Sequence, residues 1–471
     1  MFKTMSSNKK AFKSAIWYTV GDIIVKGLGF LTTPLFTRIL TTSDYGEYSN
    51  FVSWISILMP LITIDLTASV SRAHFDFPED MDNFVLSSVL FSNLATAIFA
   101  VFSIFSIGYL ESWMSIDRKY IFAMFIYFLL EPAYSYLQGY FRMLFRYKAF
   151  TEIALVSAAL RTGMALLFTV LFDDKLFACI IGYTVPVSVM YGIIYVYIVI
   201  KAQKVKMKYW RYAAKISLPL IPHTLSGNLL SSFDRVAIRK LCNAENLAYY
   251  SLAYNVAMIV SLVRAAVDKA WTPWLYENLH EKEYSQIKKV SRVYILIFET
   301  VICGLMLLGP EFVLIFGGKS YTEAKYVIPP IMVGLIFQFL YTFYVGIELF
   351  AKKTPIVSIG TLSALGINVI TNIMFIPRYG YIAAAYTTLF SYLVLLIIHF
   401  CFARKMMDLS EVYDNRLIFI SGLVCIIVGI AMEQLYRFDY LRYTLILAFA
   451  ICLIGGCIFV WKNRGKFNVR I

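Results

Sequence analysis

Long apolar segments recur along the whole chain and limit what it can fold into. There are about fourteen of them, each near the ~20 residues that an α-helix needs to cross a bilayer. They lie at 14–39, 46–71, 84–110, 118–141, 150–172, 176–200, 214–240, 247–272, 288–310, 326–350, 355–376, 381–403, 416–433 and 441–461. Only 15% of the 471 residues are charged, too few to cover a water-soluble protein of this size. We therefore predict an all-α polytopic membrane protein.

Positive charge is distributed unevenly between the predicted loops. With a cytoplasmic N-terminus, the inner loops and tails hold more than twice as many Lys and Arg residues as the outer loops. Because positive charge is retained on the cytoplasmic side during insertion, this bias predicts that both termini are cytoplasmic. Loops that face anionic lipid also explain the formal net charge of +14, so we predict membrane lipids and no nucleic acid as partners.

A basic stretch, Lys201–Lys215, divides the chain after its sixth predicted span and is interpreted as a cytoplasmic linker at the lipid surface. Arg38 precedes Tyr48-Ser49 at nearly the spacing with which Arg239 precedes Tyr250-Ser251. This common offset predicts two parallel copies of one six-helix unit, with a cavity between them at the midplane. The predicted domains are a first lobe at 1–200, the linker at 201–213, a second lobe at 214–404, and two additional helices with a tail at 405–471.

Cations inside predicted spans are the strongest functional signal. A charge in the hydrocarbon costs about 3 kcal/mol on insertion scales, so such residues mark a function or a tight pair. The cations are Lys26, Arg161, Arg235, Arg264 and Lys269. Phosphate oxygens accept charge-assisted hydrogen bonds from Arg and Lys, so we predict that these five residues bind an anionic cargo such as a diphosphate.

Carboxylates also lie within the spans. Asp22, Asp65, Glu131 and Asp268 are candidates for coupling transport to H⁺ or Na⁺, and a role as counter-charges is the alternative.

Local pairing offers a second explanation for several of these charges. Asp22 and Lys26, and likewise Arg264 and Asp268, are four residues apart and can neutralise each other along one helical face. Asp234 and Arg235 lie near the predicted outer end of their span, where a position at the membrane interface is the alternative.

Catalytic and metal-binding motifs are absent from the sequence. The four histidines form no HExxH pattern, the seven cysteines include no CxxC pair, and there is no GxxxxGK loop. We therefore predict neither an enzyme nor a bound cofactor or metal.

Four segments together resemble a known family. They are Gly27–Pro34 with Arg38 and Tyr45–Tyr48, Leu218–His223 with Asp234-Arg235, Phe316–Lys319 with Tyr321, Ala324 and Pro329, and Asn372 with Ile376–Gly380 and Ala383–Ala385. The set resembles the Wzx-type oligosaccharide flippases of the multidrug/oligosaccharidyl-lipid/polysaccharide (MOP) exporter superfamily. The resemblance implies a V-shaped, two-lobed transporter. By alternating access it would move undecaprenyl-diphosphate-linked oligosaccharide to the outer leaflet for O-antigen or capsule biosynthesis.

Two other cargoes remain open. The additional helix pair near the C-terminus supports a lipid II flippase as an alternative, although the first-lobe segments are more similar to the oligosaccharide branch. A cation-coupled multidrug exporter would need acidic residues in excess, and the five cations within the spans argue against it. The resemblance further implies a monomer in the bacterial cytoplasmic membrane, working alongside a polysaccharide polymerase and glycosyltransferases.

Overall fold

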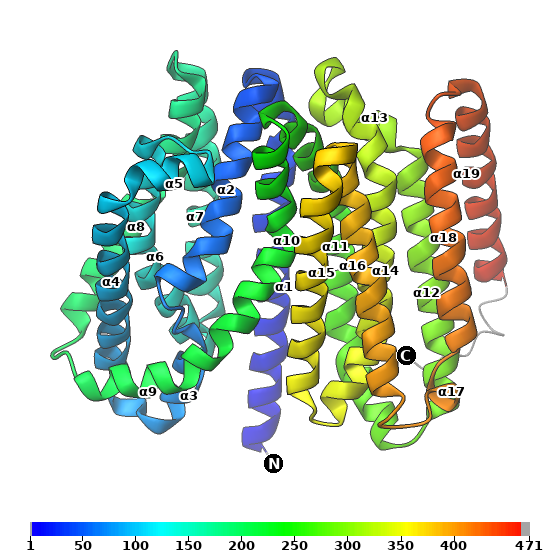
Figure 1. Cartoon of the computed structure of the whole chain (residues 1–471). Coiled ribbons are helices and arrows are strands. Elements are labelled where there is room, and N and C mark those ends of the chain that lie inside the picture. The colour runs from blue at the N-terminus through cyan, green and yellow to red at the C-terminus, as the bar shows by residue number, and fades with distance from the viewer. Residues whose placement is uncertain (1, 463–471) are drawn as a thin grey trace. The chain divides into compact units, whose positions relative to one another are not determined.

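The structure is a computed structural model. It describes the backbone of residues 2–462 and the side chains of residues 17–456 and 458, apart from Asp22, Leu262 and Ala266. Helices make up almost all of this part of the chain, which contains no β-strand (Figure 1). The long helices are α1 (Phe2–Ile39), α2 (Thr42–Ile62), α4 (Met81–Phe105), α6 (Arg118–Met143), α7 (Tyr147–Leu171), α8 (Lys175–Lys201), α10 (Ile221–Leu241), α11 (Ala244–His280), α12 (Tyr284–Leu307), α14 (Ile328–Phe350), α15 (Thr354–Tyr379), α16 (Ile382–Ala403), α18 (Asn415–Leu435) and α19 (Asp439–Lys462).

Shorter helices connect them. These are α3 (Thr67–Asp76), α5 (Ile107–Met114), α9 (Met207–Ser217), α13 (Gly309–Gly317) and α17 (Leu409–Val412), with 3₁₀ turns at Pro78–Asp80, Leu218–Leu220 and Lys319–Val327.

The prediction of an all-α membrane protein is confirmed, but the number of spans is not. Within the described residues, 12 helices are long and apolar enough to cross a membrane, or 13 when α2 and α3 are counted as one span. Two of the fourteen predicted spans account for the difference: the span at 46–71, which is broken between α2 and α3, and the span at 214–240. The second does not pass as a spanning helix. It coincides with a 3₁₀ turn and with α10, where Asp234, Arg235, Arg239 and Lys240 lower the hydropathy.

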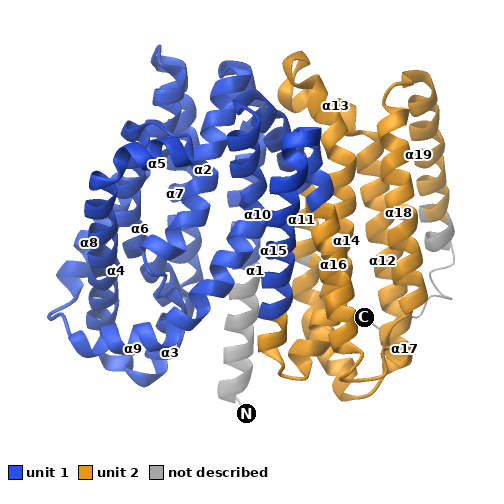
Figure 2. Ribbon diagram, viewed as in Figure 1, with its two compact units in different colours: residues 1–258, 358–387 blue, residues 259–357, 388–471 orange. Residues whose placement is uncertain are grey.

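The chain divides into two compact units (Figure 2). Unit 1 is Met1–Met258 with Ser358–Thr387, so it takes α1 to α10, the start of α11, most of α15 and the start of α16. Its core lies among α2, α4, α6 and α8, where Phe51, Phe84 and Phe128 are completely buried. This core includes α6, which carries Glu131, and α2, which ends three residues before Asp65.

Unit 2 is Ile259–Val357 with Thr388–Ile471. Its central helix is α14, which is buried along most of its length. Aromatic rings fill the contact between α12 and α14, and the Phe298 and Phe339 centroids are 4.0 Å apart. Because α14 has little contact with lipid, polar side chains on it must find partners inside the unit.

The predicted linker is largely helical. Figure 1 shows α9 lying across one end of unit 1, nearly perpendicular to α4 and α8. Its Tyr209 is fully buried, and its hydroxyl hydrogen-bonds Asp80, which also pairs with Lys206 Nζ at 2.5 Å. The opposite face presents exposed Lys208, Arg211 and Lys215. An amphipathic helix with a cationic outer face is typical of the bilayer interface.

Candidate functional site

Arg161 lies on α7, a helix long enough to span the membrane, and tyrosines surround its side chain. Its Nη2 donates a hydrogen bond to the Tyr191 hydroxyl at 3.0 Å, and its Nη1 donates one to the Tyr183 hydroxyl at 3.4 Å. Its guanidinium carbon lies 5.4 Å from the Tyr183 ring centroid and 5.9 Å from that of Tyr127. No carboxylate of the described residues is within ion-pairing distance, and Nε lacks an acceptor. The direct contacts of Arg161 are therefore with neutral groups, while the buried Glu131 carboxyl lies within electrostatic range without forming an ion pair.

Two tyrosines of α2 connect Arg161 with a second predicted cation. The Tyr48 ring packs edge-on against Tyr183, with centroids 5.8 Å apart. One turn earlier, the Tyr45 hydroxyl accepts a hydrogen bond from Asn255 at 2.9 Å and lies within electrostatic range of Arg235. Unit 1 thus brings Arg161 and Arg235 to neighbouring tyrosines of one helix.

Arg235 itself rests on an aromatic ring. Its guanidinium carbon is 4.6 Å from the Tyr254 centroid, and no ion pair forms between it and any described carboxylate. A guanidinium stacked on a ring keeps its charge and its outward-facing donors, so it can still bind an anion.

A cavity of about 290 Å³ in unit 1 is lined by both Asp65 and Glu131. It lies where α2 breaks into α3, beside α6 and α10. Asp65 Oδ1 accepts hydrogen bonds from Thr67 N at 3.0 Å and Thr67 Oγ1 at 2.6 Å. Glu131 is buried and accepts from the Ser135 hydroxyl.

Other oxygens complete the lining of this acidic cavity, from Ser56, Thr63 and Thr224. Carboxylate, hydroxyl and carbonyl oxygens are the donors that hard cations prefer, and a carboxylate can instead take up a proton. Asp65 and Glu131, which the sequence analysis named separately, are therefore parts of one cavity.

The remaining predicted residues of unit 1 are on α1. Lys26 is exposed on the helix surface. The side chain of Asp22 lies outside the described residues, so the predicted Asp22–Lys26 pair is not described.

In unit 2, Arg264 and Asp268 are close enough to neutralise each other. Arg264 Nε lies 3.8 Å from Asp268 Oδ2, and Nη1 donates to the Gln338 carbonyl at 3.2 Å. This is the local pairing raised as an alternative for these two residues. Lys269 is exposed next to them.

A buried polar network surrounds Asp234, and the sequence analysis missed it. Asp234 is only 2% exposed, which contradicts an interface position. Its carboxylate accepts from Asn372 Nδ2 at 2.7 Å and from the Tyr250 hydroxyl at 2.6 Å. Asn372 in turn contacts Asn368 and Thr387. Asn residues in an apolar segment were the available signal, because a lone amide in a span needs a buried partner.

A second missed pair is Glu348 on α14 and His399 on α16. Both side chains are fully buried, and His399 Nδ1 lies 2.9 Å from Glu348 Oε2. The Tyr341 ring stacks on the imidazole with centroids 5.5 Å apart. Nothing in the sequence links two residues in different spans, so this pair could be found only in three dimensions.

Metal clusters are not seen in the part of the chain that the structure describes, where no three His, Cys, Asp or Glu side chains converge on one point.

Comparisons with known proteins agree with this architecture. The family model described as polysaccharide biosynthesis protein matches residues 11–279. An Lsg locus protein of Haemophilus influenzae is 24% identical over 401 residues, covering 80% of this chain and 95% of its own. The capsular polysaccharide biosynthesis protein CapF of Staphylococcus aureus is 21% identical over 400 residues, covering 82% of this chain and 97% of its own.

Two solved structures share the fold. The lipid II flippase MurJ in an inward closed conformation has a TM-score of 0.69 and 15% identity, and covers 91% of this chain and 100% of its own. An inward-facing multidrug resistance transporter of the MATE family has a TM-score of 0.61 and 13% identity, and covers 83% and 97%. The family match spans more than half of the chain, and the fold is the one shared by these two solved transporters. This multi-pass membrane protein therefore belongs to the polysaccharide biosynthesis protein family.

Proposed function

We propose that this chain is a flippase that moves undecaprenyl-diphosphate-linked oligosaccharide across the bacterial cytoplasmic membrane for surface polysaccharide biosynthesis. The observation that carries the proposal is Arg161. An arginine within a span, held by phenolic oxygens and without a described carboxylate partner, stabilises an anion rather than a cation. Family membership and the relative named for capsular polysaccharide support the same class of cargo.

The proposed mechanism is alternating access. Arg161 and Arg235 attract the diphosphate, with Lys26, Arg264 and Lys269 as further candidate contacts, while the polyprenyl chain remains in lipid. Arg264 contributes least in this proposal, because Asp268 already offsets its charge. Both termini face the cytoplasm, and the chain works as a monomer alongside a polymerase and glycosyltransferases.

Coupling to H⁺ or Na⁺ is assigned to the acidic cavity. Asp65 and Glu131 lie in the same cavity, at a broken helix, where spanning segments commonly bind ions. Asp268 is a weaker candidate because it faces Arg264, and Asp22 remains a candidate from the sequence alone.

The acidic cavity also favours a second candidate function, a cation-coupled multidrug exporter, since two carboxylates there suit a cationic cargo. Lipid II remains a third possible cargo, and Arg161 does not separate it from an oligosaccharide because both are carried on a diphosphate.

Transport in proteoliposomes tests the proposal. The assay follows a fluorescent undecaprenyl-diphosphate oligosaccharide, in parallel with lipid II and a cationic dye. Arg161→Gln is expected to lower the initial rate of oligosaccharide flipping at least tenfold, and Arg161→Lys to retain part of it. Arg437→Gln, at an exposed arginine between α18 and α19, is the matched control and keeps the wild-type rate.

Three results would contradict the proposal. Export of the dye without flipping of any lipid-linked sugar would establish the exporter instead. Flipping of lipid II alone would assign the third cargo. Full activity of a folded Arg161→Gln variant would remove the arginine from substrate binding.

A further inference from the structure

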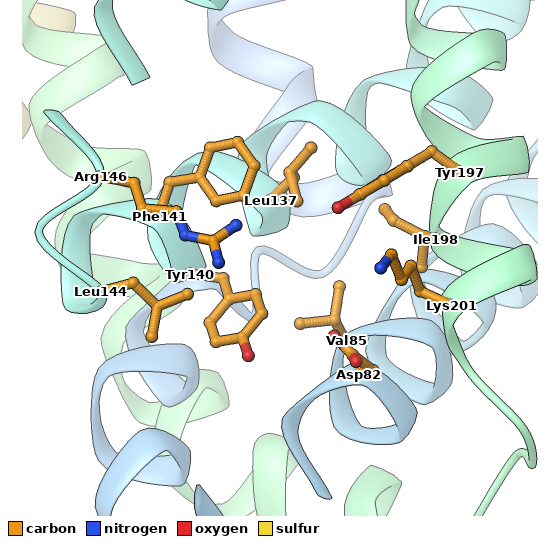
Figure 3. A pocket seen from close by; sticks show the side chains of 10 residues that line it. All are labelled: Asp82, Val85, Leu137, Tyr140, Phe141, Leu144, Arg146, Tyr197, Ile198 and Lys201. Carbon is orange, nitrogen blue, oxygen red and sulfur yellow. The ribbon is translucent and has the colours of Figure 1, made fainter. Parts of the chain in front are cut away.

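A second cavity, of about 120 Å³, lies at one end of unit 1 where α4, α6 and α8 meet (Figure 3). Its polar lining residues are Asp82, Tyr140, Arg146, Tyr197 and Lys201. The rest of the lining is apolar and mostly buried, as Val85, Leu137 and Ile198 show. We call it the Arg146–Lys201 pocket. None of its residues belongs to the proposed cargo or coupling sites.

Two cations converge on this pocket. Figure 3 shows the Arg146 guanidinium and the Lys201 ammonium pointing into it from opposite sides, with Asp82 at one edge. Neither cation is within ion-pairing distance of a carboxylate among the described side chains. Each lies beside an aromatic ring, Arg146 at 5.8 Å from the Phe141 centroid and Lys201 at 5.9 Å from the Tyr197 centroid.

The net charge of the pocket indicates the charge of the group that it can bind. Two cations and one carboxylate leave a single positive charge, which one phosphodiester neutralises. A diphosphate would bring additional negative charge next to Asp82, and a zwitterionic headgroup would leave the positive charge uncompensated. The three charged side chains are exposed, at the open side of the pocket, and charge balance there favours a group that carries one negative charge.

The face of α8 that leads to the pocket is apolar and exposed. Ile193, Val196 and Ile200 are 67%, 55% and 75% exposed. Exposed aliphatic side chains on a membrane-sized helix contact lipid tails. Tyr197 and Lys201 continue the same side of the helix, so that aliphatic, aromatic and cationic side chains follow one another. That order matches the passage from hydrocarbon to headgroups.

The chain after Lys201 is fixed in place. Asn83 Oδ1 on α4 accepts hydrogen bonds from the backbone N–H groups of Gln203 at 2.8 Å and Lys204 at 2.9 Å. Lys206 N donates to Ser87 Oγ at 3.0 Å. The end of α8 is therefore tied to α4, and Lys201 is held near the pocket before any ligand arrives.

From these observations we infer that the Arg146–Lys201 pocket binds the headgroup of an anionic membrane phospholipid. Arg146 and Lys201 contact the phosphodiester oxygens, and the Tyr140 hydroxyl donates a further hydrogen bond. Asp82 accepts from headgroup hydroxyls, and the acyl chains run along Ile193, Val196 and Ile200. This lipid is a resident ligand of unit 1 and is distinct from the transported cargo.

Native mass spectrometry of the purified full-length protein tests the inference, with phosphatidylglycerol as the probe and phosphatidylcholine as the comparison. Wild type is expected to retain one phosphatidylglycerol about tenfold more tightly than phosphatidylcholine. Arg146→Gln combined with Lys201→Gln abolishes that preference. Lys204→Gln combined with Lys215→Gln removes the same charge from exposed positions outside the pocket and leaves the preference intact.

Further arms identify the source of the phosphate and guard against misfolding. Excess inorganic phosphate should not displace the lipid, and displacement would identify a site for free phosphate and overturn the inference. Equal loss of lipid in both double variants would show that the lipid is held by the overall surface charge and not by the pocket, and would overturn the inference. Arg146→Lys keeps the charge with little disturbance and should retain the lipid, and its failure to do so would count against the site. No cargo is present, so the outcome is independent of the proposed flippase activity.

Discussion

At the scale of single residues, Glu348 and His399 form a buried polar pair that links α14 to α16 in unit 2. Both side chains are fully buried, and each is the polar partner of the other. Removing one member of such a pair leaves a buried polar or charged group without a partner, which costs more than the pair itself contributes. Moving α14 away from α16 would leave both buried groups without a partner, so the pair holds the two helices together.

A double-mutant cycle tests this coupling. Glu348→Leu and His399→Leu are each expected to lower the free energy of unfolding by about 3 kcal/mol. The double variant Glu348→Leu with His399→Leu should lose less than the sum of two single substitutions to Leu, because no buried partner is stranded. Thermal unfolding in detergent measures each variant, and strictly additive losses would show that the two residues act independently.

At the scale of elements, α7 and α8 pack closely because Gly182 has no side chain. A Cβ at Gly182 would lie 2.5 Å from the Met164 carbonyl oxygen and 2.7 Å from Ala165 Cα, so both obstructing atoms belong to backbone. Such close approach through small residues is a common way for membrane helices to associate. It also positions Tyr183 and Tyr191 of α8 against Arg161 of α7.

We expect Gly182→Ala to push α7 away from α8 and to lower the unfolding temperature by several degrees. Gly192→Ala lies on the same helix with no heavy atom within 4 Å of the added Cβ, and it should have little effect. If the two substitutions behave alike in a thermal melt, the close contact is not a determinant of stability.

Asp414 joins α18 to α12 outside the spans. It accepts hydrogen bonds from Leu417 N at 3.2 Å and Arg292 Nε at 2.8 Å. Burial raises the pKa of Asp414, but these donors outweigh burial and hold the pKa below its ordinary value. Since the folded pKa is the lower one, the stabilisation is complete above the unfolded value near ~3.9 and is lost as the pH falls through the folded pKa.

Amide exchange across the start of α18 should therefore accelerate below about pH 4, after correction for intrinsic rates. In Asp414→Asn this segment should exchange faster at neutral pH and should lose the acid-dependent step. Hydrogen–deuterium exchange with mass spectrometry measures both effects. An unchanged pH profile in the variant would assign the acid sensitivity to another carboxylate.

The sequence predicted the positions of the helices better than the contacts between them. Hydropathy placed most spans because each apolar segment reports its own transfer into lipid. It missed the break between α2 and α3, because Thr63, Ile64 and Asp65 change the average hydropathy little while their backbone leaves the helix.

The candidate site was predictable in its residue types but not in its groupings. Arg161 stood out as a lone cation in a span, and Asp65 and Glu131 as carboxylates. The cavity that Asp65 and Glu131 share, and the tyrosines that Arg161 meets, depend on tertiary contacts that no local pattern encodes. Asp234 was misjudged because its position near a helix end says nothing about the Asn372 amide that meets it.

At the scale of the whole molecule, the distribution of charge predicts the orientation in the membrane. The basic linker and α9 lie at one end of unit 1. The charge bias predicts that the linker and both termini are cytoplasmic. Arg437, between α18 and α19, is predicted to lie on the other side.

Cysteine labelling in intact cells tests this orientation. In a background with the seven native cysteines replaced by serine, Lys204→Cys should react with a membrane-impermeant maleimide only after permeabilisation. Arg437→Cys should react without it. The reverse pattern would show that the topology is the opposite of the predicted one. Equal labelling of both positions without permeabilisation would contradict their placement on opposite sides of the membrane.

The break between α2 and α3 divides one span into two helices that are held by different partners. The α2 piece is clamped to α10, through the ion pair of Glu47 with Arg239 at 2.6 Å and the hydrogen bond from Asn228 to the Ser56 carbonyl at 2.8 Å. The α3 piece is fastened instead to α9, where the Tyr212 hydroxyl donates to Asp76 at 2.6 Å. The joint itself is also held, since Leu66 N donates a hydrogen bond to the Tyr136 hydroxyl of α6 at 3.2 Å. A displacement of α9 relative to α10 would therefore be taken up around Asp65 and would change the shape of the acidic cavity.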